Sequence, residues 1–278
     1  MLRLPHGQDC AVRITGPADA PPILALHGWQ DNAASFEVLA PLLPGYRIVA
    51  LDFPGHGLST PRPLSAPYYI WSYITEIRAV VEHFGWQQFQ LLGHSMGGAT
   101  ACLYAALYPQ ELSKLFLLDS VGPLTTEPDK LPQQMREALA DMESLKARQR
   151  NYYRDFDTAV RARADKGISL EAATMFGKRG IVCDDKGCYW NLDPRLRILN
   201  PLSLSEEQVR AFMVQIACPV ALVLAPGFWQ QKPHRQQMLK QRLGYLKNIE
   251  VHQLQGGHHQ HMDGQAGEIA GLIRHFFA

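Results

Sequence analysis

The sequence predicts an α/β fold in which helices cover both faces of a mostly parallel central sheet. From Pro21 onward, short unbroken apolar runs alternate with longer stretches of helical periodicity. A strand with one face in water alternates apolar and polar residues, whereas an unbroken apolar strand is typical of a parallel sheet that is buried on both faces. The length of 278 residues is enough for one such domain that carries an insertion.

Six apolar runs are predicted to be strands, and they cover residues 23–26, 46–51, 89–92, 115–118, 220–224 and 249–254. Apolar residues recur at helical spacing over 70–84 and 269–277, and residues 99–107 are helix-like as well. Strands and helices that alternate in this way are typical of a doubly wound sheet.

The alternation stops at about residue 123 and resumes at about residue 204. Residues 123–203 open with a stretch rich in Pro and charge, and they show helical periodicity without a clear buried strand. Their many Leu, Tyr, Phe and Met residues argue against a disordered linker. We therefore interpret 123–203 as a mainly helical cap inserted into a core of 1–122 and 204–278. Ser205 predicts the capped start of the helix that follows.

Composition and charge argue against several classes of partner. The formal net charge of +1 does not suggest binding to nucleic acid or to an anionic membrane. No apolar run approaches the roughly 20 residues of a membrane span, and the N-terminal residues do not resemble a secretory signal. We expect a soluble, cytoplasmic enzyme with a small-molecule substrate and no cofactor, whose oligomeric state these features do not determine.

The five cysteines are scattered and odd in number, which suits a reducing cytosol rather than a disulfide framework. Cys183 and Cys188 are close enough in sequence to form a bridge across a hairpin. We nevertheless expect both to be free thiols.

The strongest local motif is Gly93-His94-Ser95-Met96-Gly97-Gly98, which follows a predicted strand and precedes a helix-like stretch. G-x-S-x-G in this setting is the pattern of a nucleophile elbow. The tight turn requires small neighbours, and it presents the Ser95 hydroxyl at the N-terminus of a helix, where backbone N–H groups stabilise negative charge. The alternative is a Gly-rich turn whose serine only caps the next helix, and the strand–turn–helix context disfavours it.

A serine nucleophile needs a base within hydrogen-bond reach, and in this pattern the chain order is serine, acid, histidine. The loop after the last predicted strand contains His258, His259 and His261. We predict that His258 is the base, because the preceding Gly-Gly pair lets the loop approach the nucleophile. His259 is the alternative, and His261 is expected to have a packing or capping role. No metal is expected, since the loop has no H-E-x-x-H pattern and no carboxylate at ligand spacing.

The acid that orients the base is not where it is usually found. That place is the turn after strand 220–224, but the sequence contains no Asp or Glu from Gln208 through Asn248. The best candidate is Asp119, which ends the strand expected to lie beside the nucleophile strand. A structural Asp that only caps the following loop is the alternative. Asp52 also ends a strand, but its turn suggests that it braces a loop.

Two backbone N–H groups are expected to bind the oxyanion. One belongs to Met96, directly after the nucleophile, and the other to Trp29, in the sharp turn after strand 23–26. The Trp29 indole could either wall the acyl pocket or be a core aromatic. Aromatic residues of the cap are expected to line a mostly apolar pocket, namely Tyr152, Tyr153, Phe156, Phe176 and Trp190.

Four motifs together resemble the α/β-hydrolase superfamily: His27-Gly28, Asp52-x-x-Gly-His-Gly-x-Ser59, the 93–98 elbow and Gly257-His258-x-x-His261. More narrowly, residues 26–36, Tyr68-Tyr69 and Leu117-Leu118-Asp119 resemble the serine hydrolase-like proteins. The resemblance covers most of the chain and is weakest in 123–203, which would correspond to a lid over the active site. It implies a carboxylesterase-like hydrolase that acts on esters or related acyl compounds through an acyl-enzyme on Ser95.

Two other functions stay open at this point. The same residues could hydrolyse a carbon–carbon bond or a thioester. The chain could also be a non-catalytic homologue that only binds a small molecule, and the missing carboxylate after strand 220–224 is the best support for that hypothesis.

Overall fold

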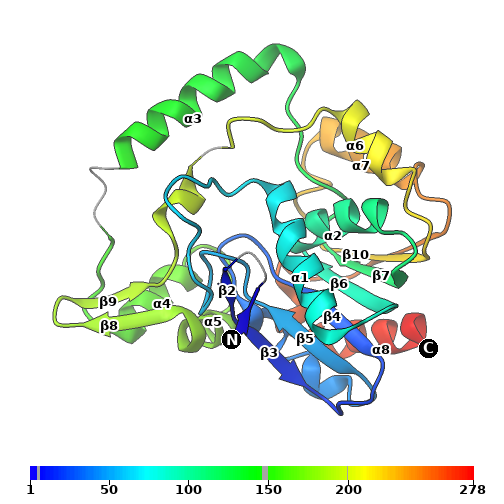
Figure 1. Cartoon of the computed structure of the whole chain (residues 1–278), viewed down its shortest axis with the longest axis horizontal. Helices are drawn as coiled ribbons and strands as arrows, with labels where there is room; N and C mark the ends of the chain where they lie inside the picture. Colours follow the sequence, from blue (N-terminus) through cyan, green and yellow to red (C-terminus); the bar gives the residue numbers. More distant parts are fainter. Residues whose placement is uncertain (5–6, 146–149, 199) are drawn as a thin grey trace.

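Seven strands form the central sheet of the computed structural model, in the spatial order β11-β10-β7-β6-β4-β5-β3 (Figure 1). All neighbouring strands are parallel except β3, which pairs antiparallel with β5 at one edge. The structure describes residues 1–4, 7–145, 150–198 and 200–278. The predicted α/β fold with a mostly parallel sheet is confirmed.

The strands of this sheet are β3 (Val12–Thr15), β4 (Pro22–Leu26), β5 (Arg47–Leu51), β6 (Phe89–His94), β7 (Leu112–Leu118), β10 (Val220–Leu224) and β11 (Ile249–Gln253). Two short antiparallel pairs lie outside it, β1 (Leu2–Arg3) with β2 (Asp9–Cys10) and β8 (Ile181–Asp184) with β9 (Gly187–Trp190). Each of the six predicted strands matches one strand of the central sheet within a few residues at either end.

The α-helices are α1 (Ile74–Phe84), α2 (Met96–Leu107), α3 (Leu131–Leu145), α4 (Phe156–Ala164), α5 (Leu170–Gly180), α6 (Glu206–Met213), α7 (Pro233–Leu243) and α8 (Ala266–Phe277). Short 3-10 helices cover Ala33–Phe36, Ala40–Leu42, Ile70–Tyr73, Pro128–Lys130, Pro194–Arg197 and Gln260–Met262. The Ser205 hydroxyl accepts from the Gln208 backbone at the start of α6, as its sequence predicts.

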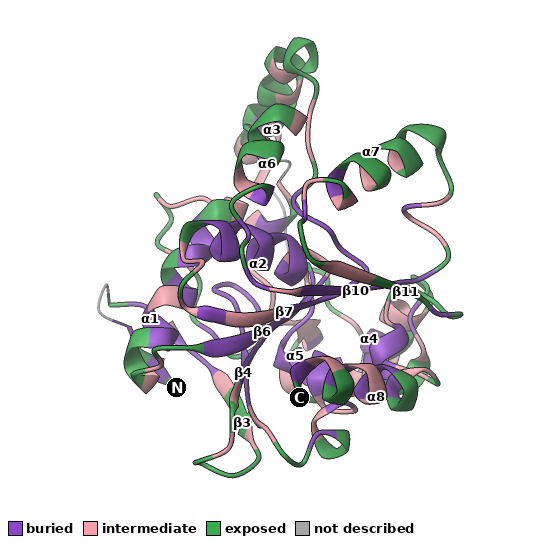
Figure 2. Cartoon of the chain, turned by 90° about the vertical axis from the view of Figure 1, so that its right-hand side faces the viewer, coloured by how far each residue is buried: buried purple, intermediate pink, exposed green. Residues whose placement is uncertain are grey.

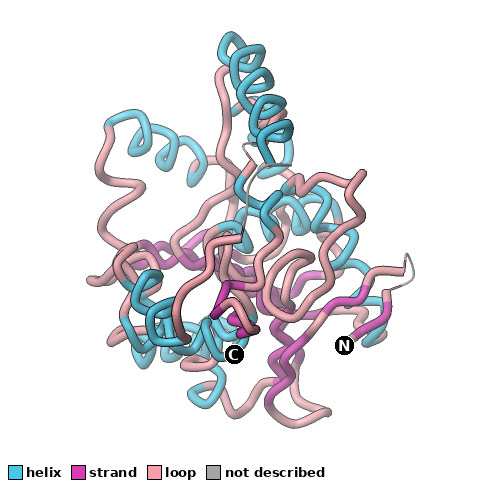
Figure 3. Tube along the Cα trace, turned by 90° about the vertical axis from the view of Figure 1, so that its left-hand side faces the viewer, coloured by secondary structure: helices cyan, strands magenta, loops and turns pink. Residues whose placement is uncertain are grey.

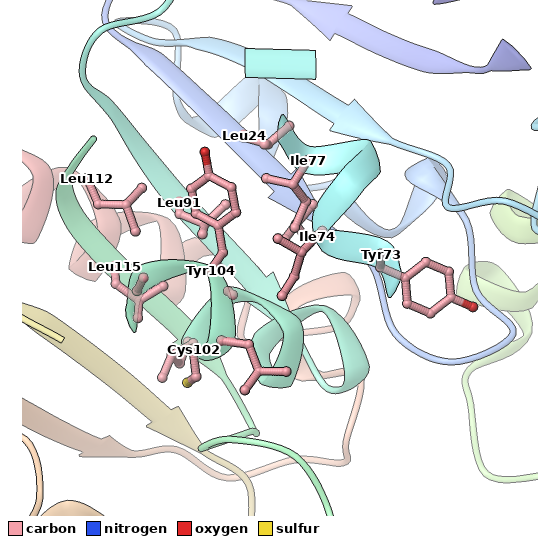
Figure 4. Close-up of a cluster of buried hydrophobic side chains, with 14 of the residues drawn as sticks. Leu24, Tyr73, Ile74, Ile77, Leu91, Cys102, Tyr104, Leu112 and Leu115 are labelled. Carbon is pink, nitrogen blue, oxygen red and sulfur yellow. The ribbon is translucent and has the colours of Figure 1, made fainter. Parts of the chain in front are cut away.

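Both faces of the sheet are buried, because alternate residues of each central strand enter different cores. In β4, Leu24 and Leu26 pack with α1, α2 and α6, whereas Ile23 and Ala25 pack with α8 and the 33–36 helix. Figure 2 shows the strands of the sheet largely buried between these layers, and Figure 4 shows side chains of the first core, including Leu24, Leu91 and Leu115.

The segment between Pro123 and Ser203 has two parts with different relations to the sheet. Helix α3 projects from the body of the protein and is largely exposed (Figures 1 and 3). Helices α4 and α5 pack together and share a small core with Ala34 and Met262 of the sheet-bearing part. Over the described part of the chain, no helix is both long enough and apolar enough to cross a bilayer.

The β8–β9 hairpin corrects two expectations. No strand was predicted here, because neither strand is a continuous buried run. Cys183 and Cys188, expected as free thiols, form a disulfide. They are directly opposite each other in the hairpin, with a Cα–Cα distance of 4.0 Å. The other three cysteines are buried and free.

Two glycines allow α2 to begin against the strand ends. A Cβ on Gly97 would lie 2.1 Å from the Leu26 carbonyl oxygen at the end of β4, and a Cβ on Gly93 would lie 2.6 Å from the Gly98 Cα. Any side chain at either position would therefore push α2 away from β4 and β6.

We expect Gly97→Ala to lower the free energy of unfolding by about 1–3 kcal/mol, because the new Cβ overlaps backbone atoms that cannot move independently. Urea denaturation measures the change. Gly267→Ala is the matched control, since a Cβ there meets no atom within 4 Å and alanine is favourable in the first turn of α8. Equal stability of the two variants would contradict this packing argument.

Candidate active site

Ser95 occupies a strained turn between β6 and α2. Its backbone has φ 52° and ψ −117°, a combination that non-glycine residues rarely adopt. Ser95 is the N-cap residue of α2, but its hydroxyl makes no capping hydrogen bond, and the residue is partly exposed. The alternative that this serine only caps the helix is therefore not supported.

Strained backbone is concentrated at one edge of the sheet. Among the described residues other than glycine, only Gln30, Ser95 and Asp119 have positive φ, at 62°, 52° and 50°. They follow β4, β6 and β7, which are neighbours in the sheet. Parallel strands end at the same edge, so the three strained residues lie around one region. Such strain costs free energy and tends to cluster at functional sites.

Asp119 and His258 are hydrogen-bonded, although 139 residues separate them in sequence. His258 Nδ1 lies 2.5 Å from Asp119 Oδ2. The Asp119 side chain is 3% exposed and the His258 side chain is 42% exposed. A carboxylate accepts and does not donate, so Nδ1 carries the proton and Nε2 is left with a lone pair.

The turn after β10, which lacks a carboxylate of its own, supports the Asp119 side chain. The Ala225 backbone N–H donates to Asp119 Oδ1 at 3.2 Å, while Oδ2 faces His258. The Trp229 indole N–H donates to the Asp119 backbone carbonyl at 3.4 Å. Both carboxylate oxygens therefore have partners, and the side chain is held in one orientation.

The loop of His258 is attached to the strained turn of Ser95 through the residue before Ser95. His94 Nε2 donates to the His258 backbone carbonyl at 2.9 Å. Within the described residues, Ser95 Oγ and His258 make no hydrogen bond to each other. Catalytic hydrogen bonds are often long in a protein without substrate and shorten in the complex.

The other two histidines of the loop have different partners. His259 Nε2 donates to Asp31 Oδ2 at 3.1 Å, and His261 Nε2 is hydrogen-bonded to Ser35 Oγ at 2.8 Å. His259 therefore faces a different carboxylate from the one that orients His258, and His261 is fully buried.

The two expected oxyanion donors lie at the ends of β4 and β6. Met96 is the first residue of α2, where helical geometry leaves the N–H free. Over the described chain, no backbone acceptor takes the N–H of Trp29 or Met96. The Trp29 side chain is 40% exposed, so it is not a core aromatic. Its ring contacts His56 edge-on at 6.0 Å.

Asp52 braces loops rather than facing His258. It accepts from the backbone N–H groups of Ala33 and Leu58 at 2.6 and 2.9 Å, and it pairs with Arg179 of α5 at 3.0 Å. This is the role that its turn suggested.

Comparison with known proteins places the chain among proteins of similar sequence and fold. Residues 21–163 match the alpha/beta hydrolase fold family. The chain is 35% identical to a serine hydrolase-like protein of Danio rerio, over 77% of this chain and 67% of that protein.

The chain belongs to the α/β-hydrolase family, in its serine hydrolase-like group.

Solved structures agree with this assignment. A hypothetical protein from Pseudomonas aeruginosa has a TM-score of 0.90 and 40% identity, over 99% of this chain and 96% of that one. The thioesterase domain from the curacin biosynthetic pathway has a TM-score of 0.83 and 26% identity, over 96% of both chains.

A mostly apolar cavity of about 820 Å³ lies beside the 55–69 loop of this α/β-hydrolase. The end of α3, Arg150 and residues from 191–195, 198 and 200–201 complete its lining, which includes Leu64, Tyr68, Met142 and Leu192. None of the five cap aromatics expected to line such a pocket does so. Phe176 of α5 is buried in the small core that α4 and α5 share. Tyr153 and Trp190 instead line a smaller, adjoining cavity of about 200 Å³, which shares Leu145, Arg150, Leu192 and Pro194 with the larger one.

Sequence reasoning missed Asp31 and its cap partner Arg163. Asp31 Oδ1 pairs with Arg163 of α4 at 2.5 Å, and the Asp31 carboxylate is 2% exposed. Burial alone would raise the pKa of Asp31, but His259, His94 and Arg163 hold it well below the ordinary value. Asp31 belongs to the 26–36 motif and follows the turn of Trp29, but no local spacing connects Asp31 to residue 163.

Buried histidines around the site, among them His27, His56 and His94, are predicted to make stability depend on pH. Burial lowers the pKa of His27 to about 4, of His56 to about 3 and of His94 to about 4. In the unfolded chain these groups titrate at about 6.5. As pH falls from about 6.5 toward 4, the unfolded state takes up protons first, so stability that is complete above 6.5 is lost over this window.

Urea denaturation at about pH 7 and pH 5 measures this loss, which is at most about 1.4 kcal/mol per pH unit for each histidine. The free energy of unfolding of His56→Asn should fall less steeply with falling pH than that of the wild type. If the free energy of unfolding falls equally in both proteins, the loss of stability has another source.

Proposed function

We propose that this α/β-hydrolase cleaves a carboxylic ester or a related acyl compound through an acyl-enzyme on Ser95. The observation that carries the proposal is the hydrogen bond between His258 and the buried Asp119, in a loop attached to the strained turn of Ser95. A hydroxyl becomes an effective nucleophile when a base with this orientation can take its proton.

In the first half of the reaction, His258 Nε2 takes the Ser95 proton as Oγ bonds to the carbonyl carbon of the substrate. Collapse of the tetrahedral intermediate breaks the bond to the leaving alkoxide, which receives that proton from His258. In the second half, His258 takes a proton from water, the hydroxide attacks the acyl-enzyme, and Ser95 Oγ regains the proton as the carboxylic acid departs. Asp119 stabilises the imidazolium in both halves without being protonated.

The negative charge of each tetrahedral intermediate is assigned to the backbone N–H groups of Trp29 and Met96. Both groups lack a protein acceptor in the described structure, and the Met96 N–H is at the positive end of α2. Strain at Gln30 and Ser95 supports this role, because each is next to a donor.

We assign a cap function to residues 123–203, and we place the apolar part of the substrate in the 820 Å³ cavity that α3 helps to line. The cavity includes Gly55, next to His56, and the His56 ring contacts Trp29. An apolar lining of this size suits a substrate with a substantial hydrocarbon portion.

A thioester is the second candidate substrate, favoured by the similarity to the curacin thioesterase domain. The same proton transfers apply, with a thiolate as the leaving group. A purely binding function is less well supported, because the acid that seemed to be missing is supplied by Asp119.

We expect a fluorophosphonate to add one label to the wild type and none to Ser95→Ala, as read by intact-protein mass. Ser144→Ala, which removes an exposed serine of α3, is the matched control and should be labelled like the wild type. Labelling of Ser95→Ala, or no labelling of the folded wild type, would refute an activated Ser95.

Asp119→Asn should reduce kcat by about 10⁴-fold on any turned-over ester, because an amide cannot stabilise the imidazolium and favours the wrong tautomer. Circular dichroism establishes that the variant is folded. A loss of kcat smaller than about tenfold would mean that Asp119 is not the triad acid.

An ester and a thioester with the same acyl chain, assayed in parallel on the wild type, distinguish the two substrate classes by kcat/KM.

A further inference from the structure

Three side chains beside the proposed catalytic residues direct metal-binding atoms at one another. Asp31, His94 and His259 each offer one such atom, and the three atoms all lie within 4.8 Å of each other. They come from the loop after β4, the end of β6 and the loop after β11, so only the fold brings them together. None of them belongs to the Ser95–His258–Asp119 set.

The His94 ring is already in the form that a metal ion requires. Its Nε2–H donates to the His258 carbonyl, so Nδ1 carries a lone pair. His94 is fully buried, and its Nδ1 has no hydrogen-bond partner. Leaving such an atom unpaired is costly. Histidines that bind metals commonly donate the other ring N–H to a backbone carbonyl in this way.

The distances fit tetrahedral coordination. Asp31 Oδ2 lies 3.1 Å from His259 Nε2 and 3.6 Å from His94 Nδ1. With metal–ligand distances of about 2.0–2.1 Å, two donor atoms of a tetrahedral site are about 3.3 Å apart. The two histidine nitrogens lie within 4.8 Å of each other. An ion bound here would replace the proton that His259 Nε2 donates to Asp31, and His259 would then carry its proton on Nδ1.

Because Gly28 has no side chain, no Cβ atom fills the space next to Asp31 Oδ2 and His94 Nδ1. A Cβ at this position would lie 2.7 Å from Asp31 Oδ2 and 2.9 Å from His94 Nδ1, too close for either contact. A metal ion bonds oxygen and nitrogen at shorter distances than these.

The charged groups around the three ligand atoms allow a cation to bind with moderate affinity. Arg163 pairs with Asp31 Oδ1 and leaves Oδ2 to face the histidines, although its positive charge weakens the attraction. His259 is 16% exposed, which gives a route from solvent, whereas Asp31 and His94 are almost fully buried.

We propose that Asp31, His94 and His259 form a binding site for a divalent transition-metal ion of the Zn²⁺ type. Imidazole nitrogens with one carboxylate are a donor set that suits zinc, with the fourth position open to water. The site does not depend on the proposed hydrolysis. His94 and His259 directly precede and follow Ser95 and His258 in sequence, so an ion held here would lie next to the proposed catalytic residues.

The test uses the full chain without an affinity tag, freed of metal with a chelator, and titrated with Zn²⁺ against a chromophoric competitor. We expect one Zn²⁺ per chain for the wild type. His259→Gln should bind at least about tenfold more weakly, since it removes a direct ligand. Titration with Co²⁺ should give the visible absorption of a tetrahedral site in the wild type and lose it in this variant.

His234→Gln is the matched control, because His234 is exposed on α7 and distant in sequence from every ligand. It should bind Zn²⁺ like the wild type. His259 is chosen for substitution because it is the most exposed of the three ligands, and a thermal melt checks its fold. No stoichiometric binding by the wild type, or equal binding by folded His259→Gln, would overturn the proposal, whatever the outcome of fluorophosphonate labelling.

Discussion

The start of α2 can lie against the ends of β4 and β6 only because Gly93 and Gly97 have no side chains. This close approach brings the Met96 N–H toward the turn that follows β4, and it leaves Ser95 in its strained conformation. It also places His94 where its ring can bond the His258 carbonyl. The Ser95 turn, the proposed oxyanion donors and the histidine loop therefore all depend on one region of backbone packing.

Buried ion pairs connect the other side of this region to α4 and α5. Asp31 pairs with Arg163, and Asp52 pairs with Arg179, each carboxylate being almost fully buried. Such pairs pay a large desolvation cost, and their net contribution to stability is small when both partners are present, but losing one partner is expensive. Helices α4 and α5 are thus positioned specifically on the sheet, whereas α3 has a single buried residue, Ala138.

The sequence was most informative where one local pattern determines the structure. Unbroken apolar runs predicted the six central strands, and the elbow motif predicted a turn that the structure shows between β6 and α2. The pairing of Asp119 with His258 was predicted from the order of strands in such a sheet. In contrast, the β8–β9 hairpin is only partly buried and so has no apolar run to reveal it. No local spacing in the histidine loop indicates the contact with Asp31, which is hydrogen-bonded to His259 although more than 200 residues separate the two in sequence.

The support of Asp119 by the turn after β10 has a consequence for comparing relatives. If Asp119 is the acid, residue 225 of that turn contributes only a backbone N–H, which donates a hydrogen bond to the Asp119 carboxylate. Any residue except proline can supply this group. The identity of residue 225 is then not restricted by the chemistry, whereas Trp229 still supports Asp119 through its indole N–H. A survey that classifies homologues as inactive because they lack a carboxylate after β10 would discard active members. The informative position for such a survey is the end of β7.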